Sequence, residues 1–138
     1  ELCSAEEDVV LDVSQCPDLF PALALLGAVR DGQTTHIGGG ARLRLKESDR
    51  IDAVSKALGA FGVEVEQFTD GIGILGTKTL KGNVTIDCCG DHRIAMMAAM
   101  AATRADGPVT LLGAECVAKS YPGFWEDYKS LGGVFQEV

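Results

Sequence analysis

The side chains best suited to chemistry are concentrated in residues 42–50, where four of nine positions are basic in a chain whose formal net charge is −8. The stretch runs from a glycine-rich segment into what we expect to be the start of a helix. Backbone N–H groups and the helix dipole attract anions at such a start. This local positive charge predicts a site for phosphate or carboxylate groups. The basic residues are Arg42, Arg44, Lys46 and Arg50.

Two local structures are compatible with this stretch. Arg42, Arg44 and Lys46 alternate in the sequence, which would place them on one face of an extended segment. Alternatively, the stretch is a solvated charged loop in which Ser48 or Asp49 caps the helix that follows. Composition alone leaves both structures open.

A second candidate group is Asp91, His92 and Arg93, which follows an expected strand and opens an alanine- and methionine-rich helix. Arg93 could hold a planar anion with two parallel hydrogen bonds, which lysine cannot do. The alternative is that Asp91 only caps the helix and Arg93 pairs with it. His92 is a possible general base, although a lone histidine is more often structural. Lys119 precedes a later expected helix in the same way.

Asp18 is the third candidate, at the start of another expected helix. A carboxylate among phosphate-binding cations can accept a proton from a hydroxyl group if the geometry allows. An aspartate at a helix start can equally serve as an N-cap, and that role needs no other residue.

Hydrophobic periodicity and turn residues predict the elements that must position these side chains. The expected order is βαβαββ followed by βαβαβ, an α/β fold of the α+β type. We expect strands at 9–13, 34–37, 63–68, 72–75, 84–88, 109–112 and 134–138, and helices at 19–29, 47–61, 91–105 and 121–131.

The two halves of this order form an internal repeat. Asp18 and Asp91 are 73 residues apart, and so are Lys46 and Lys119. Each pair falls at the same point of the same βαβα pattern, which favours duplication over chance. Turns between strands and helices tend to meet at one end of such an assembly. We therefore expect these side chains to form one site for a multiply anionic substrate that undergoes acid–base chemistry.

Composition sets outer limits on the function. The 46% hydrophobic and 23% charged residues are typical of a globular domain. A net charge of −8 argues against nucleic acid or an anionic membrane as the main partner, and no apolar run approaches the roughly 18 residues that span a bilayer. The five cysteines are odd in number and form no C-x-x-C pair, so we expect reduced thiols. Cys88, Cys89 and His92 match no common zinc spacing, so we expect no metal. The chain does not begin with Met, and we expect it to be cut from a longer polypeptide.

At these residues the sequence closely resembles the 5-enolpyruvylshikimate-3-phosphate (EPSP) synthases. The resemblance covers nearly the whole chain and rests on blocks at 17–18, 45–50, 91–96 and 118–122, in family order. Lys46-Glu47-Ser48-Asp49-Arg50 followed by Asp91-His92-Arg93 is highly specific. The related UDP-N-acetylglucosamine enolpyruvyl transferases share the fold but not this pair of blocks.

The resemblance implies transfer of the carboxyvinyl group of phosphoenolpyruvate to the 5-hydroxyl of shikimate 3-phosphate, without metal or organic cofactor. It implies a cytoplasmic parent, expected to be a monomer, whose two domains each contain three βαβαββ units in an inside-out α/β barrel. Residues 1–138 would be part of the C-terminal domain, with repeat units at about 9–75 and 84–138. The rest of the site would lie on the N-terminal domain, so we expect this chain to be inactive alone.

The resemblance also implies a role for each candidate residue. Asp18 resembles the family's general base toward the 5-hydroxyl and a shikimate 3-phosphate ligand, and Lys46 a second such ligand. Glu47 resembles a proton-shuttling carboxylate near the phosphoenolpyruvate methylene. Some family members have Asn in place of Arg42, so no role is transferred to Arg42. The phosphoenolpyruvate-binding cations would be Arg50, Arg93 and Lys119.

Two other functions stay open at this point. The chain could belong to an enolpyruvyl transferase with a different acceptor, or it could be an excised folding module that does not catalyse.

Overall fold

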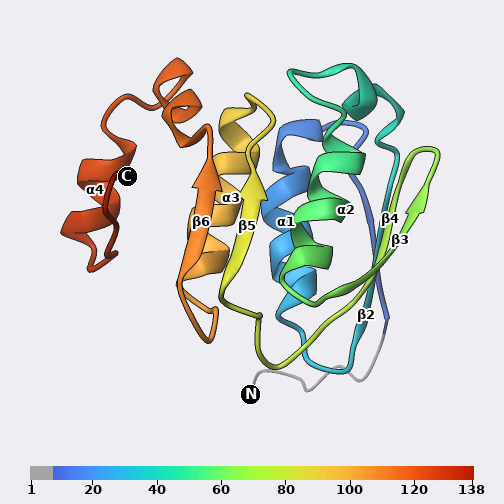
Figure 1. The fold of residues 1–138 in the computed structure, drawn as a ribbon. Helices are drawn as coiled ribbons and strands as arrows, with labels where there is room; N and C mark the ends of the chain where they lie inside the picture. Colours follow the sequence, from blue (N-terminus) through green and yellow to red (C-terminus); the bar gives the residue numbers. More distant parts are fainter. Residues whose placement is uncertain (1–7) are drawn as a thin grey trace.

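The structure is a computed structural model that describes residues 8–138 (Figure 1). Its strands are β1 (Val9–Asp12), β2 (Thr34–Gly38), β3 (Glu64–Phe68), β4 (Gly71–Leu75), β5 (Val84–Asp87) and β6 (Val109–Leu112). Its α-helices are α1 (Phe20–Ala28), α2 (Arg50–Ala60), α3 (His92–Ala102) and α4 (Phe124–Ser130). Three 3₁₀ helices precede α1, α2 and α4: η1 (Pro17–Leu19), η2 (Ala41–Leu45) and η3 (Ala114–Lys119).

The strands form two sheets with α1, α2 and α3 packed between them (Figure 1). The four-stranded sheet has the order β1-β2-β4-β3, in which β1 and β2 are parallel and the other neighbours are antiparallel. The second sheet is the parallel pair β5-β6. α2 contacts strands of both sheets and therefore joins the two halves of the chain.

Two apolar clusters hold these layers together. The larger one lies between the four-stranded sheet and the three helices, and includes Phe20 of α1, Leu58 of α2 and Ile72 of β4, all fully buried. The smaller one, around Cys88, Cys116 and Phe124, packs α3 against η3 and α4. Burial of this apolar area is the main favourable contribution to the free energy of folding, and it holds the helices in place against the sheets.

The expected repeat is visible in the order of elements. A parallel strand pair linked by a helix, then a 3₁₀ helix and a further α-helix, occurs first as β1-α1-β2-η2-α2 and again as β5-α3-β6-η3-α4. Only the first half continues into an antiparallel hairpin, β3-β4.

Three expectations about local structure were wrong. No strand forms at 134–138, where no described residue offers a pairing partner and Val134 is largely exposed. The helix expected from 47 begins only at Arg50, because Asp49 caps it there. Of the two structures left open for the stretch with Arg42, Arg44 and Lys46, the extended one is wrong, because Ala41–Leu45 is a 3₁₀ helix.

Among residues 8–138, no helix combines the length and the apolar character needed to cross a membrane.

Candidate active site

The N-termini of α1, α2 and α3 meet at one end of the molecule, the upper end in Figure 1. The chain reaches this end from β1, β2 and β5, and each strand is followed there by a loop or a 3₁₀ turn. Residues from four separated parts of the sequence are thus brought together. Partial positive charge from three helix N-termini adds to that of the basic side chains.

Arg50, the first residue of α2, is the centre of the cluster. Its guanidinium is 1% exposed and donates to three carboxylates. Nε lies 2.8 Å from Asp91 Oδ2, Nη1 lies 2.9 Å from Asp18 Oδ1, and Nη2 lies 2.7 Å from Glu47 Oε2. Burial favours the neutral guanidine, but the hydrogen bonds and charges of the three carboxylates outweigh it and raise the pKa of Arg50.

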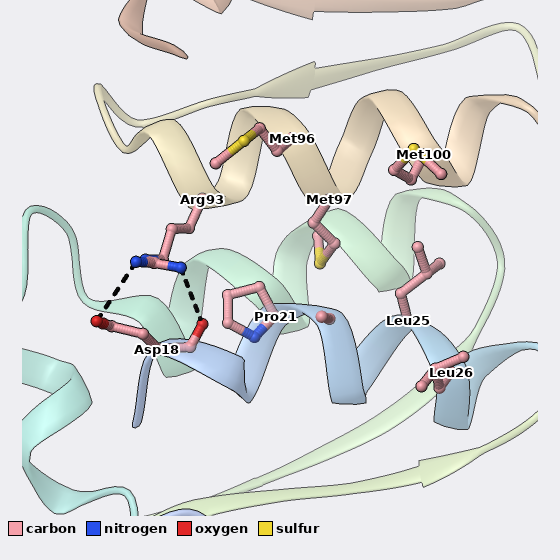
Figure 2. Close-up of a pocket in the computed structure, with 9 residues that line it drawn as sticks. Asp18, Pro21, Leu25, Leu26, Arg93, Met96, Met97 and Met100 are labelled. Carbon is pink, nitrogen blue, oxygen red and sulfur yellow. Dashed lines mark hydrogen bonds and ion pairs between the residues drawn. The ribbon is translucent and has the colours of Figure 1, made fainter. Parts of the chain in front are cut away.

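Asp18 lies in η1 and is surrounded by cations. Besides Arg50, its carboxylate faces Arg93 Nη2 at 3.4 Å and Lys46 Nζ at 3.9 Å, while its side chain remains 51% exposed. Arg93 Nη1 also donates to the Asp18 carbonyl at 3.4 Å (Figure 2). Desolvation works to raise the pKa of Asp18, but these positive charges prevail and lower it below its ordinary value.

The alternative role for Asp18, as an N-cap of the helix that follows, was wrong. The N-cap position of α1 is Leu19, and no side chain there accepts a hydrogen bond from the helix backbone. Pro17 and Pro21 flank the helix start and lack the N–H groups that a cap would satisfy. The Asp18 carboxylate is therefore turned toward the cations rather than toward the backbone.

Asp91 does cap α3, as expected, by accepting from Arg93 N at 3.0 Å. It is fully buried and also takes hydrogen bonds from Arg50 and, at 2.9 Å, from Ser48 Oγ. Desolvation raises the pKa of Asp91, yet the donors around it outweigh this and lower the pKa overall. The side chain of Arg93 pairs with Asp18, not with Asp91, so that part of the structural alternative was wrong.

Lys46 and Glu47 lie in the short loop between η2 and α2. Asp49 closes this loop by accepting from Asp52 N at 3.1 Å, which confirms one of the two expected caps. The cap and the charge cluster coexist, because Glu47 points to Arg50 and Lys46 to Asp18.

Lys119 is at the edge of the cluster. Its Nζ donates to Gly90 O at 2.8 Å, next to Asp91 in the chain, and forms no ion pair within residues 8–138. Arg44 turns away: it donates to Thr69 O at 3.0 Å and to Phe68 O at 2.7 Å, and so braces the β3-β4 hairpin.

An apolar groove of about 370 Å³ runs between α1 and α3, and Asp18 and Arg93 close one end of it (Figure 2). Leu25 and Leu26 come from α1, and three methionines from α3. α1 contains no polar side chain at all, yet Leu26 is 60% exposed. A helix that is apolar all round is normally covered on every side.

His92 does not join the cluster. It is buried, and its Nδ1 has no hydrogen-bond partner in the described part of the chain. Residues 8–138 contain no group of three His, Cys, Asp or Glu side chains placed to hold a metal ion. Cys88 is buried, and desolvation raises the pKa of its thiol to about 12, so it stays protonated at neutral pH.

Five of the six predicted site residues are thus within one connected set of ion pairs, and the sixth, Lys119, is next to it. The sequence placed Asp91 in a candidate group at this end of the fold, either as part of the site or as a helix cap, but gave no sign of its pairing with Arg50. The arrangement has two partly exposed carboxylates on the two terminal nitrogens of one guanidinium, with further cations beside them. Such a site can bind an anion and exchange protons with it.

Comparison with known proteins agrees with the resemblance seen in the sequence blocks. Residues 5–128 match the family model described as EPSP synthase (3-phosphoshikimate 1-carboxyvinyltransferase). The chain is 53% identical over 130 residues to the 3-phosphoshikimate 1-carboxyvinyltransferase of Clostridium kluyveri and 49% identical over 129 residues to that of Clostridium acetobutylicum. Each match covers 94% of this chain and 30% of the relative, so the chain spans about a third of the length of these relatives.

A solved structure supports the fold as well. The EPSP synthase from Acinetobacter baumannii superposes with a TM-score of 0.81 at 38% sequence identity, over 88% of this chain and 28% of that chain. The expected mixed α/β fold of the enolpyruvyl transferases is therefore confirmed. The family match, the two relatives and the shared fold show that this chain belongs to the EPSP synthase family.

Proposed function

We propose that the chain supplies part of the active site of an enzyme that transfers the carboxyvinyl group of phosphoenolpyruvate to the 5-hydroxyl of shikimate 3-phosphate. The relatives named 3-phosphoshikimate 1-carboxyvinyltransferase support this activity. The product would be a precursor of chorismate and the aromatic amino acids. No cofactor is required for this chemistry, since both bond changes proceed by proton transfer and loss of phosphate.

One observation carries the proposal: Asp18 and Glu47 lie on the two terminal nitrogens of Arg50, with Lys46 and Arg93 beside Asp18. The reaction needs a base for the hydroxyl, an acid for the methylene carbon, and fixed positive charge for the phosphate. A connected group of side chains from three separated stretches of the sequence, at 18, 46–50 and 93, supports this assignment.

In the proposed reaction, Asp18 takes the proton of the 5-hydroxyl as its oxygen bonds to C2 of phosphoenolpyruvate. Glu47, protonated from solvent before the addition, gives this proton to the C3 methylene and takes one back from the resulting methyl group when the C2–O bond to phosphate breaks. Inorganic phosphate leaves, and the proton on Asp18 returns to solvent. Arg50, Arg93 and Lys119 bind phosphoenolpyruvate, while Lys46 and Asp18 bind shikimate 3-phosphate.

The charges around Asp18 suit a base that is activated by substrate. Cations hold the pKa of Asp18 low in the ligand-free site, which keeps it ionised but makes it a weak base. A phosphate or carboxylate that takes over Arg93 and Lys46 would remove this effect and add negative charge nearby. Both changes raise the pKa of a carboxyl group, so the proton acceptor would become stronger when substrate is bound.

The proposal includes a place for this chain in the full-length protein. We infer that residues 1–138 belong to the C-terminal domain, as two repeat units at about 9–75 and 84–138. The matched share of about 30% of each relative leaves room for a further unit and for the N-terminal domain. The exposed apolar groove between α1 and α3 is consistent with cover by another part of that polypeptide. The parent would be a cytoplasmic monomer.

Phosphate release by the full-length protein tests the function. With phosphoenolpyruvate and shikimate 3-phosphate we expect turnover, and with UDP-N-acetylglucosamine as acceptor none. The reverse result would assign the chain to an enolpyruvyl transferase with a different acceptor. The 138-residue chain alone should show folded circular dichroism and no phosphate release. Catalysis by that chain alone would contradict the division of the site between two domains.

A further inference from the structure

The carboxylate of Asp91 has more partners than a helix cap requires. Oδ2 accepts from Ser48 Oγ at 2.9 Å and from Arg50 Nε at 2.8 Å. Oδ1 accepts from Arg50 Nη2 at 3.2 Å and from Arg93 N at 3.0 Å. Asp91 therefore joins the loop before α2, the first side chain of α2 and the first turn of α3.

The pairing fixes one edge of the Arg50 guanidinium. Nε and Nη2 point at the two oxygens of Asp91 in the parallel arrangement that gives arginine–carboxylate pairs their directional strength. The rest of the planar group must then face the opposite way. Nη1 and the second hydrogen of Nη2 reach Asp18 and Glu47, on the substrate side of the proposed site.

Burial separates the partners of Arg50 into two kinds. Asp91 is 0% exposed, whereas the side chains of Asp18 and Glu47 are 51% and 43% exposed. Arriving substrate anions can replace a partly exposed carboxylate as a partner of Arg50. They cannot replace Asp91 without first unpacking the start of α3. Asp91 is thus a permanent partner of Arg50, and the other two can be exchanged.

We propose that Asp91 is a positioning residue for the reaction: it holds Arg50 in the one orientation that presents Nη1 and Nη2 to the anionic substrate. Asp91 does not touch substrate and acts through Arg50. The inference rests on the proposed function, because its effect is measured in that reaction. It differs from a capping role, which would need only the contact between Asp91 and Arg93 N.

The first test is Asp91→Asn in the full-length enzyme. Asn caps helices about as well as Asp, so the contact with α3 is kept while the charge and one acceptor toward Arg50 are lost. We expect kcat/KM for phosphoenolpyruvate to fall by about 10²-fold, the effect of a misplaced binding group. KM for shikimate 3-phosphate should change much less.

Asp49→Asn is the matched control. It makes the same change at the N-cap of α2, where the carboxylate contacts Asp52 N and Arg44 but not Arg50. Its kinetic constants should equal those of the wild type. If the wild-type enzyme releases no phosphate from phosphoenolpyruvate and shikimate 3-phosphate, the proposed function itself is refuted. Wild-type turnover together with an unchanged kcat/KM in folded Asp91→Asn would overturn the positioning role.

A double-mutant cycle with Arg50→Lys separates positioning from general damage to the fold. If Asp91 acts through Arg50, the combined loss in kcat/KM is smaller than the product of the two single losses. Losses that multiply would overturn the proposal. Should Asp91→Asn fail to fold, Ser48→Ala decides, since it removes one hydrogen bond to Asp91 and keeps the charge. A several-fold fall in kcat/KM for phosphoenolpyruvate is expected there, and wild-type kinetics would overturn the proposal.

Discussion

Asp18, in η1 just before α1, and Asp91, at the N-cap of α3, precede the corresponding helices of the two halves of the chain, and they lie in opposite environments. Asp18 is half exposed, faces Arg50, Arg93 and Lys46, and caps no helix. Asp91 is fully buried, caps α3 and accepts hydrogen bonds from Arg50 Nε and Nη2. The two aspartates therefore differ in their access to solvent, and under the proposed function the exposed one does chemistry while the buried one supports Arg50.

Burial decides which use is possible. A carboxylate that must exchange protons with a substrate needs access to it, and Asp18 has that access. A carboxylate that must keep a buried guanidinium charged and oriented needs the opposite, and Asp91 has no solvent contact. The two lysines also differ in their partners: Lys46 faces Asp18, whereas Lys119 donates to the Gly90 carbonyl beside Asp91.

The largest expected effect is on stability and separates the two aspartates directly. Asp91→Ala leaves the Arg50 charge with less compensation in a buried place and removes the cap of α3. It should lower the free energy of unfolding of the chain by about 3–5 kcal/mol. Asp18→Ala removes a partly exposed partner and should cost no more than about 1 kcal/mol.

Urea denaturation of the two variants, followed by circular dichroism, measures both values. If the two variants lose the same free energy of unfolding, Asp91 does not support the fold more than Asp18 does.

The next largest effect is on activity and concerns Arg93 of α3, which forms an ion pair with Asp18. Arg93→Lys keeps the charge but loses the planar fork. Loss of one charge-assisted hydrogen bond is worth about 1.5–3 kcal/mol, so kcat/KM for phosphoenolpyruvate should fall by roughly 10–100-fold in the full-length enzyme.

The matched control is Arg104→Lys, since Arg104 is exposed beyond the other end of α3. The control should behave as the wild type. If Arg93→Lys keeps the wild-type kcat/KM for phosphoenolpyruvate, Arg93 does not bind this substrate through its planar group and has only a structural role.

The smallest effect appears only in acid. The pKa of Asp91 is lower in the folded chain than its ordinary value near 4, so the unfolded chain binds more protons between those two values. The stabilisation from Asp91 is therefore complete above about pH 4 and is lost as the pH falls through the folded value. Asp12 and Asp52 also have lowered pKa values, and they contribute equally in both proteins because neither depends on Arg50 or Asp91.

The free energy of unfolding of the wild type and of Asp91→Asn should be compared from pH 7 down to pH 2. The wild type should lose more stability than the variant in the acid range, so the two curves converge. Parallel curves would show that Asp91 makes no charge-dependent contribution.

Elements defined by local sequence were predictable. The helix expected at 47–61 forms as α2, and its apolar residues at helical spacing, Ile51, Val54 and Leu58, are all fully buried. The two strands expected at 63–68 and 72–75, separated by only three residues, form as β3 and β4 and pair as an antiparallel hairpin. Local turn chemistry and periodicity depend only on neighbouring residues, which is why the sequence was sufficient for them.

Features that depend on distant partners were not predictable from spacing. Nothing local indicates that Arg50 is buried, because its burial depends on a carboxylate 41 residues away. The convergence of Asp18, Lys46 and Arg93 could be inferred only from the repeat. The strand expected at 134–138 failed for a related reason, since a strand forms only when another strand is present to pair with it.

The most direct test of the division between the two aspartates is Asp18→Asn in the full-length enzyme. Asn has nearly the shape of Asp but cannot accept the hydroxyl proton. We expect kcat to fall by something on the order of 10²–10⁴-fold, with the denaturation midpoint of the wild type retained, because Asp18 caps no helix. A fully active Asp18→Asn enzyme would contradict the account and move the base to Glu47.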